Sequence, residues 1–191
     1  MGILLYTVGP KTVRGIILLA VYFTGLLLSL GYTPIFKRYG LGELGGFLAV
    51  GFLNQLFCYT ANTMPNLNVL VAFVPLSIYA AAFFTVDQWV DAEHDYEKGR
   101  VSLAVLLWLG KTPIQAYIYS GVTLAYIVCV IAWILKLIPP LTVLVNFLSY
   151  PIVVYLVSLL TVNVEKAIKI GLITLVYILP LLNCLSLIPY I

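Results

Sequence analysis

Charged residues are scarce in this chain of 191 residues, and they make up only 9% of it. Soluble domains carry roughly 25%. A chain so poor in charge cannot cover a globular surface with groups that water solvates, which excludes a soluble domain and indicates a membrane protein. The formal net charge is +3, and no run of basic residues suggests a nucleic-acid partner.

Cysteine is also rare. Cys58, Cys129 and Cys184 each stand alone within an apolar segment. Their spacing matches no metal-binding motif and gives no disulfide framework, so we interpret them as small buried hydrophobic residues.

Apolar residues are abundant, at 63% of the chain. Six stretches are long enough to cross about 30 Å of hydrocarbon at 1.5 Å per residue. They lie near 13–34, 42–63, 67–88, 113–136, 140–162 and 167–189. The sequence therefore predicts an all-α fold, a polytopic membrane bundle of six transmembrane helices that forms a single domain over residues 1–191. Gly42 and Gly46 form a G-x-x-x-G pair, which predicts close helix packing at the start of the second span.

The loops differ in positive charge, and this difference predicts an orientation in the cell membrane. Seven basic residues fall on one side: Lys37, Arg38, Lys98, Arg100, Lys111, Lys166 and Lys169. Three fall on the other: Lys11, Arg14 and Lys136. We expect the first side to be cytoplasmic, which places both termini outside and the acidic segment 87–111 in the cytoplasm.

Five of the seven acidic residues fall between Thr85 and Gly110. Asp87, Asp91 and Asp95 are spaced i, i+4, i+8, so on a helix they line one face with neighbours about 6 Å apart. Such carboxylates repel one another unless a cation lies among them, and Mg²⁺ prefers oxygen ligands and bridges carboxylate to phosphate. The pattern predicts a metal–diphosphate site at the membrane surface.

Plainer interpretations of the same residues stay open. The acidic stretch could be a solvated loop without a ligand, and basic residues at cytoplasmic helix ends can serve topology alone. His94 and Glu93 lie off the face of the three aspartates, so neither is a strong candidate. A small transporter or channel is a rival of another class, but such proteins place ionisable groups within their spans, and these spans hold almost none.

The segment DAEHDYEKGRVSLAVLLWLG resembles the second aspartate-rich motif of the UbiA superfamily of intramembrane prenyltransferases, D-x-E-x-D-x-x-x-G-[KR]-x-[ST]-L-x-V followed by L-G. The matching residues are Asp91, Glu93, Asp95, Gly99, Arg100, Ser102, Leu103, Val105, Leu109 and Gly110. Tyr32 to Gly51, with its G-L-G-E-L turn, is similar to the loop and helix that precede this motif, above all in menaquinone-type members.

This resemblance implies a Mg²⁺-dependent transfer of a prenyl group from a prenyl diphosphate to an aromatic or other lipophilic acceptor, in quinone or lipid biosynthesis. Asp91 and Asp95 would be the catalytic carboxylates and would bind the metal with support from Asp87. Diphosphate contacts would come from Arg100, Lys98, Lys37 and Arg38.

The sequence departs from the family pattern in one respect. Family members usually have nine helices and a first motif, N-D-x-x-D, whereas the other acids here are Glu43 and Glu165. We therefore expect the chain to correspond to the last two-thirds of the family fold. A partner membrane chain, or a second copy of this chain, would then complete the site. The alternative is a catalytically inactive structural or assembly subunit of a larger membrane complex.

Overall fold

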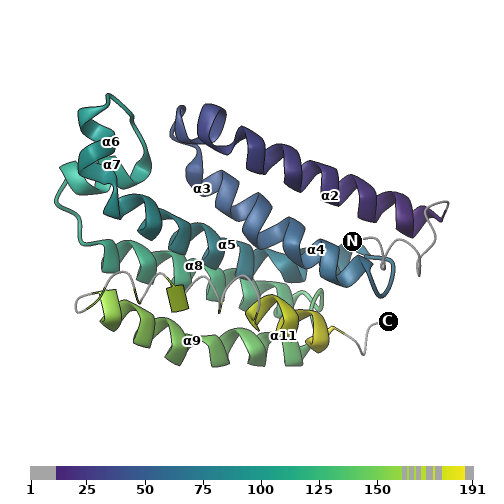
Figure 1. Cartoon of the computed structure of the whole chain (residues 1–191). Helices are drawn as coiled ribbons and strands as arrows, with labels where there is room; N and C mark the ends of the chain where they lie inside the picture. Colours follow the sequence, from purple (N-terminus) through teal and green to yellow (C-terminus); the bar gives the residue numbers. More distant parts are fainter. Residues whose placement is uncertain are drawn as a thin grey trace.

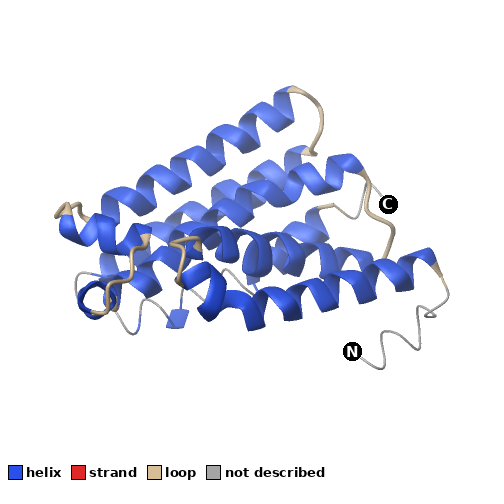
Figure 2. Ribbon diagram, turned by 90° about the horizontal axis from the view of Figure 1, so that it is seen from above, coloured by secondary structure: helices blue, strands red, loops and turns tan. Residues whose placement is uncertain are grey.

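The computed structural model describes residues 12–160, 163, 166, 169–170, 174 and 178–187. Within these residues every regular element is a helix, and short loops join the helices (Figures 1 and 2). The predicted all-α membrane bundle is thereby confirmed.

The long helices are α2 (Val13–Gly31), α5 (Leu67–Val90), α8 (Ile114–Ile134) and α9 (Pro140–Leu160). Among the described residues, these four are long and apolar enough to cross a membrane. The shorter elements are η1 (Tyr32–Lys37), α3 (Gly42–Gly45), η2 (Gly46–Leu53), α4 (Asn54–Thr60), α6 (Ala92–Glu97), α7 (Leu103–Leu109) and α11 (Leu179–Ser186). Both η elements are π-helical.

The predicted spans compare directly with these helices. Four of the six correspond to α2, α5, α8 and α9. The second span, 42–63, is divided into the successive segments α3, η2 and α4, and only α11 is described as an element within 167–189. The count of six transmembrane helices, and the single domain, stay predictions.

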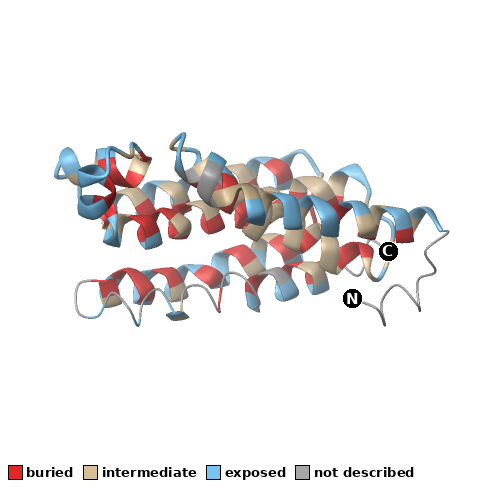
Figure 3. Ribbon diagram, turned by 45° about the horizontal axis from the view of Figure 1, so that its top comes forward, coloured by how far each residue is buried: buried red, intermediate tan, exposed pale blue. Residues whose placement is uncertain are grey.

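The central helix of the bundle is α5. In its most apolar stretch 67% of the residues are buried, against 17% for α2. It packs against η2 on one side and α8 on another. Buried residues lie on the sides of helices that face each other, and the outer sides are exposed (Figure 3). Large exposed apolar side chains are what a bilayer requires of an outer surface.

A stripe of glycines allows η2 and α5 to approach closely. A Cβ placed on Gly46 would lie 2.8 Å from the Cβ of Phe84, and one placed on Gly51 would lie 2.8 Å from the Cβ of Ser77. Gly42 lies in the same way against the amide of Gln88. The close packing predicted for Gly42 and Gly46 is therefore present, and it fixes Gln88 beside α3.

Buried amides join α11 to α4 and α5 inside the bundle. The side-chain nitrogen of Asn183 in α11 donates to Gln55 Oε1 at 2.7 Å and to the carbonyl of Ala72 at 3.0 Å. Gln55, in α4, donates to the carbonyls of Gly51 and Phe73. Gln55 and Asn183 are completely buried, so these hydrogen bonds hold α4, α5 and α11 together.

Two helices end in a left-handed residue that is not glycine. Lys111 has φ 52° and Lys136 has φ 58°. After Lys111, the amide of Thr112 donates back to the carbonyl of Leu107 at 2.9 Å, which closes α7. Glycine is usual at this position because it has no Cβ to strain the left-handed backbone.

Lys111→Gly is therefore expected to stabilise the protein by roughly 0.5–1 kcal/mol. Glycine relieves the strain of the left-handed backbone, and the greater conformational freedom of glycine in the unfolded chain offsets part of this gain. Thermal unfolding in detergent micelles measures this. Lys98→Gly is the control, because Lys98 ends α6 at φ −84° and gains nothing from glycine. Equal changes in Tm for Lys111→Gly and Lys98→Gly would show that left-handed strain at Lys111 is not what glycine relieves.

Candidate functional site

The acidic residues lie where α5 gives way to α6 and α7, at one end of the bundle (Figure 1). Asp91 occupies the turn between α5 and α6, with φ −92° and ψ 4°. The amide of Asp95 still donates to the carbonyl of Asp91 at 2.9 Å, so the chain bends there without leaving a helical path completely. The expectation that Asp87, Asp91 and Asp95 line one helical face stays a prediction, and the structure shows that the helix is interrupted at Asp91, the middle residue of the three.

Asp95 differs from the other two aspartates in its surroundings. Arg100 Nη1 donates to Asp95 Oδ1 at 2.7 Å, and the side chain of Asp95 is 3% exposed while that of Arg100 is 39% exposed. A predicted metal ligand and a predicted diphosphate contact thus form an ion pair with each other. Each partner neutralises the other when no ligand is bound.

Asp87 and Asp91 are both exposed, and so are Glu93 and His94. Within the described part of the chain, no three His, Cys, Asp or Glu side chains lie close enough to hold a metal ion by themselves. Of the three predicted metal ligands, Asp87 and Asp91, one turn apart at the end of α5, are therefore the two that are exposed.

The corner that positions Asp95 follows from the residues after it. Gly99 has φ 69°, the amide of Gly99 donates to the carbonyl of Tyr96, and the amide of Arg100 donates to the carbonyl of Asp95. These two bonds end α6 in a Schellman motif, which favours glycine. The hydroxyl of Ser102 then accepts from the amide of Val105 at 3.2 Å and caps α7. The G-R-x-S part of the motif therefore builds the turn that brings Arg100 to Asp95.

Tyr32 connects the acidic end to the loop before α3. Its ring packs edge-on against Phe84 in α5, with centroids 5.2 Å apart. Burial raises the pKa of Tyr32, and the carboxylates of Asp87, Glu43 and Asp95 raise it further. Three carboxylates from two segments therefore act on this one hydroxyl.

Two of the other predicted diphosphate contacts, Lys98 and Arg38, form no salt bridge with a described aspartate. Lys98 and Arg38 are exposed, and the guanidinium of Arg38 lies 6.0 Å from the centre of the Tyr39 ring. The side chain of Lys37 lies outside the described residues. Arg38, Lys98, Arg100 and Lys111 nevertheless share the acidic end of the bundle, because the helices they follow or precede all end there.

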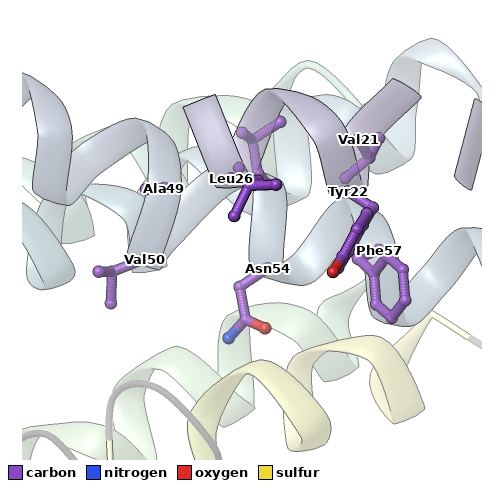
Figure 4. A pocket seen from close by; sticks show the side chains of 9 residues that line it. Val21, Tyr22, Leu26, Ala49, Val50, Asn54 and Phe57 are labelled. Carbon is purple, nitrogen blue, oxygen red and sulfur yellow. The ribbon is translucent and has the colours of Figure 1, made fainter. Parts of the chain in front are cut away.

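An apolar groove lies between α2 and the helix formed by η2 and α4. It has a volume of about 390 Å³. Figure 4 shows Tyr22 and Phe57 together at one end of it, Val50 at the other and Asn54 between them. Gly25, in its wall, precedes Tyr32 by seven residues, about 10 Å of helix. A long apolar chain in this groove could extend toward the acidic end.

Three residues near the site did not stand out in the sequence as functional candidates: Tyr32, Glu43 and Gln88. The available signal was polarity in an apolar setting. Gln88 and Glu43 fall at the ends of predicted membrane spans, where polar side chains are rare and often functional. Their placement together depends on the contact between α3 and α5, which no local pattern reveals.

A model of the UbiA prenyltransferase family matches residues 1–183 of the chain. Neither the curated proteins nor the solved structures compared with the chain give a match. The matched region contains both segments that resemble the family, residues 32–51 and 91–110.

Proposed function

The chain belongs to the UbiA prenyltransferase family, and from this premise we propose that it takes part in transferring a prenyl group from a prenyl diphosphate to a lipophilic acceptor within the membrane. The observation that carries the proposal is the acidic corner at the end of α5, where aspartates and arginine gather at the boundary of an apolar bundle. A prenyl diphosphate has an anionic headgroup and an apolar tail, so it needs a charged site directly beside an apolar one.

The carboxylates fit a magnesium ion in chemistry and in number. Proteins commonly bind Mg²⁺ through one or two carboxylates and leave the other positions to water and substrate phosphates. Asp87 and Asp91 supply two such groups at the end of α5. Asp87 and Asp91 would hold the ion, whose positive charge would stabilise the departing diphosphate.

The basic residues at the same end complete the binding of the diphosphate. Arg100 offers two parallel donors to phosphate oxygens, and Lys98, Lys37 and Arg38 supply further positive charge. Donors held in place before the reaction stabilise the departing diphosphate as its charge develops. The prenyl chain lies in the apolar groove beside Gly25 and Val50, and further carboxylates come from a partner chain or a second copy.

A second candidate function is a non-catalytic subunit of a membrane complex. The Asp95–Arg100 pair favours it, because the charge of this motif aspartate is neutralised without a ligand. In that case the Asp95–Arg100 pair only stabilises the turn between α6 and α7, and no prenyl diphosphate binds.

The two candidates differ in binding of farnesyl diphosphate to the full chain in lipid nanodiscs, measured by titration calorimetry with Mg²⁺ and again with EDTA. We expect Mg²⁺-dependent binding that Asp91→Asn weakens roughly 10- to 100-fold, because a charged ligand of the cation is lost. Glu97→Gln is the control, since Glu97 is exposed on the same short helix. If binding did not depend on Mg²⁺, or if Asp91→Asn and Glu97→Gln bound farnesyl diphosphate equally well, a non-catalytic subunit would be the better explanation.

A further inference from the structure

The turn between α8 and α9 carries positive charge at the end of the bundle opposite to the acidic corner (Figure 1). There α8 ends at Ile134, α9 begins at Pro140, and Lys136 lies between them. Arg14, near the start of α2, is at this end too, whereas every acidic residue that the structure describes is at the other end. An anion at this end therefore meets lysine and arginine and no described carboxylate.

Lys136 has a backbone conformation that is unusual for lysine. Its φ is 58°, its amide donates to the carbonyl of Trp133 at 2.8 Å, and the amide of Leu137 donates to the carbonyl of Ala132 at 2.9 Å. These bonds form a Schellman motif, in which glycine is the usual residue at this position. The side chain of Lys136 is exposed. A charged side chain at a strained backbone position is a reason to look for a function.

An apolar groove begins at this turn and follows α9 into the bilayer region. It has a volume of about 280 Å³, and its walls are Trp133 of α8 and Pro140, Val143, Leu144 and Phe147 of α9. The residues from α9 are spaced i, i+3, i+4 and i+7, which places them on one face of the helix. From Pro140 to Phe147 this face extends about 10 Å along the helix axis. The groove therefore has the direction and the apolar lining that suit the acyl chain of a membrane lipid.

The charged turn and the groove adjoin each other. Trp133 lies in the wall of the groove, and its carbonyl accepts from the amide of Lys136. A lysine side chain is long enough to carry its ammonium group to the boundary between lipid and water. The first turn of α9 adds the positive end of a helix dipole. An acyl chain in the groove and a phosphate at the turn are two parts of one phospholipid.

We propose that the groove between α8 and α9 binds an anionic phospholipid, with one acyl chain along α9 and the phosphate beside Lys136. A zwitterionic phospholipid carries a cationic group beyond its phosphate, and Lys136 repels that group, so an anionic headgroup is favoured. The site lies at the opposite end of the bundle from the proposed diphosphate site, and it does not depend on prenyl transfer.

The fluorescence of Trp133 reports on the groove directly, because its side chain forms part of the wall. The test uses the full chain with Trp89→Phe and Trp108→Phe, so that Trp133 is the single tryptophan. Circular dichroism checks that this parent protein keeps its helical content. In phosphatidylcholine nanodiscs, a fixed fraction of the lipid is replaced by dibrominated phosphatidylglycerol or by dibrominated phosphatidylcholine. Bromine quenches indole fluorescence only at short range, so the quenching measures which lipid occupies the groove.

Phosphatidylglycerol is expected to occupy the groove about fivefold more favourably than phosphatidylcholine, the usual effect of one lysine at a membrane surface. Lys136→Asn should abolish this preference, because asparagine tolerates the left-handed backbone and carries no charge. Lys111→Asn is the matched control, since Lys111 has φ 52°, follows Trp108 by three residues and lies at the other end of the bundle. Equal quenching by both lipids, or equal loss of preference in both variants, would overturn the proposal.

Val143→Phe tests the groove itself by placing a larger side chain in it. Quenching by both brominated lipids should fall severalfold, since the ring takes the space of the acyl chain beside Trp133. Val154→Phe is the matched control, because it makes the same change at an exposed position of α9 that does not line the groove. It should leave quenching unchanged. If quenching in Val143→Phe also stayed unchanged, lipid would reach Trp133 from outside the groove, and the proposed site would be overturned.

Discussion

Replacing Gly51 by alanine is expected to lower the stability of the bundle by about 3 kcal/mol, at the upper end of the usual cost of overpacking. The added Cβ would lie 2.8 Å from the Cβ of Ser77 and closer still to its backbone. Ser77 cannot retreat easily, because its hydroxyl donates to the carbonyl of Phe73 at 2.7 Å and α5 is buried on most sides. Thermal unfolding in detergent micelles should show Tm lowered by roughly 6–12 °C.

Gly25 provides the matched control for this variant. It is a glycine within a helix, yet a Cβ there would meet no atom within 4 Å. Gly25→Ala should leave Tm unchanged or raise it slightly, since alanine favours a helix over glycine. If the two variants lowered Tm equally, close packing of η2 on α5 would not be what Gly51 provides.

Replacing Arg100 by alanine is expected to loosen the corner between α6 and α7. Asp95, with a side chain 3% exposed, would lose its ion pair with Arg100 while staying buried. Breaking a buried ion pair costs roughly 3–5 kcal/mol, but the side chain of Arg100 is 39% exposed and water screens the pair. We therefore expect a loss of roughly 1–3 kcal/mol, measured as a lower Tm together with faster hydrogen exchange over residues 92–102.

Two further variants test this reasoning. Lys98→Ala should change neither quantity, because Lys98 is exposed and adjoins the same turn. Combining Asp95→Asn with Arg100→Ala should recover much of the lost stability, because a neutral amide is easier to bury than a carboxylate that has lost its ion pair with Arg100. If the loss of stability in the double variant equalled the sum of the losses in the two single variants, the Asp95–Arg100 ion pair would not be the source of the lost stability.

Much of the architecture could be predicted from the sequence because membrane helices are encoded by length and apolarity alone. Long apolar runs predicted α2, α5, α8 and α9 to within a few residues at most ends. The family could be predicted because the motif keeps its order over twenty residues. Gly42 and Gly46 indicated close packing, since small residues at that spacing have few other uses in a membrane helix.

The geometry of the acidic site could not be predicted in the same way. The i, i+4, i+8 spacing assumes an uninterrupted helix, and the sequence contains no signal for a break at Asp91. Periodicity also cannot show whether Asp95 faces a ligand or Arg100, because that choice depends on how Gly99 turns the chain. The pairing of Glu43 with Thr85 joins segments 42 residues apart and follows only from the packing of α3 on α5.

The hydrogen bond between Asn183 and Gln55 has a consequence for how the protein is made. Its two partners are separated by 128 residues, so the ribosome completes the second long after the first has left the exit tunnel. Until α11 is in place, the side-chain oxygen of Gln55 lacks the donor that it has in the complete bundle. We therefore expect a chain cut short before α11 to leave this oxygen without its donor and to form a less stable bundle.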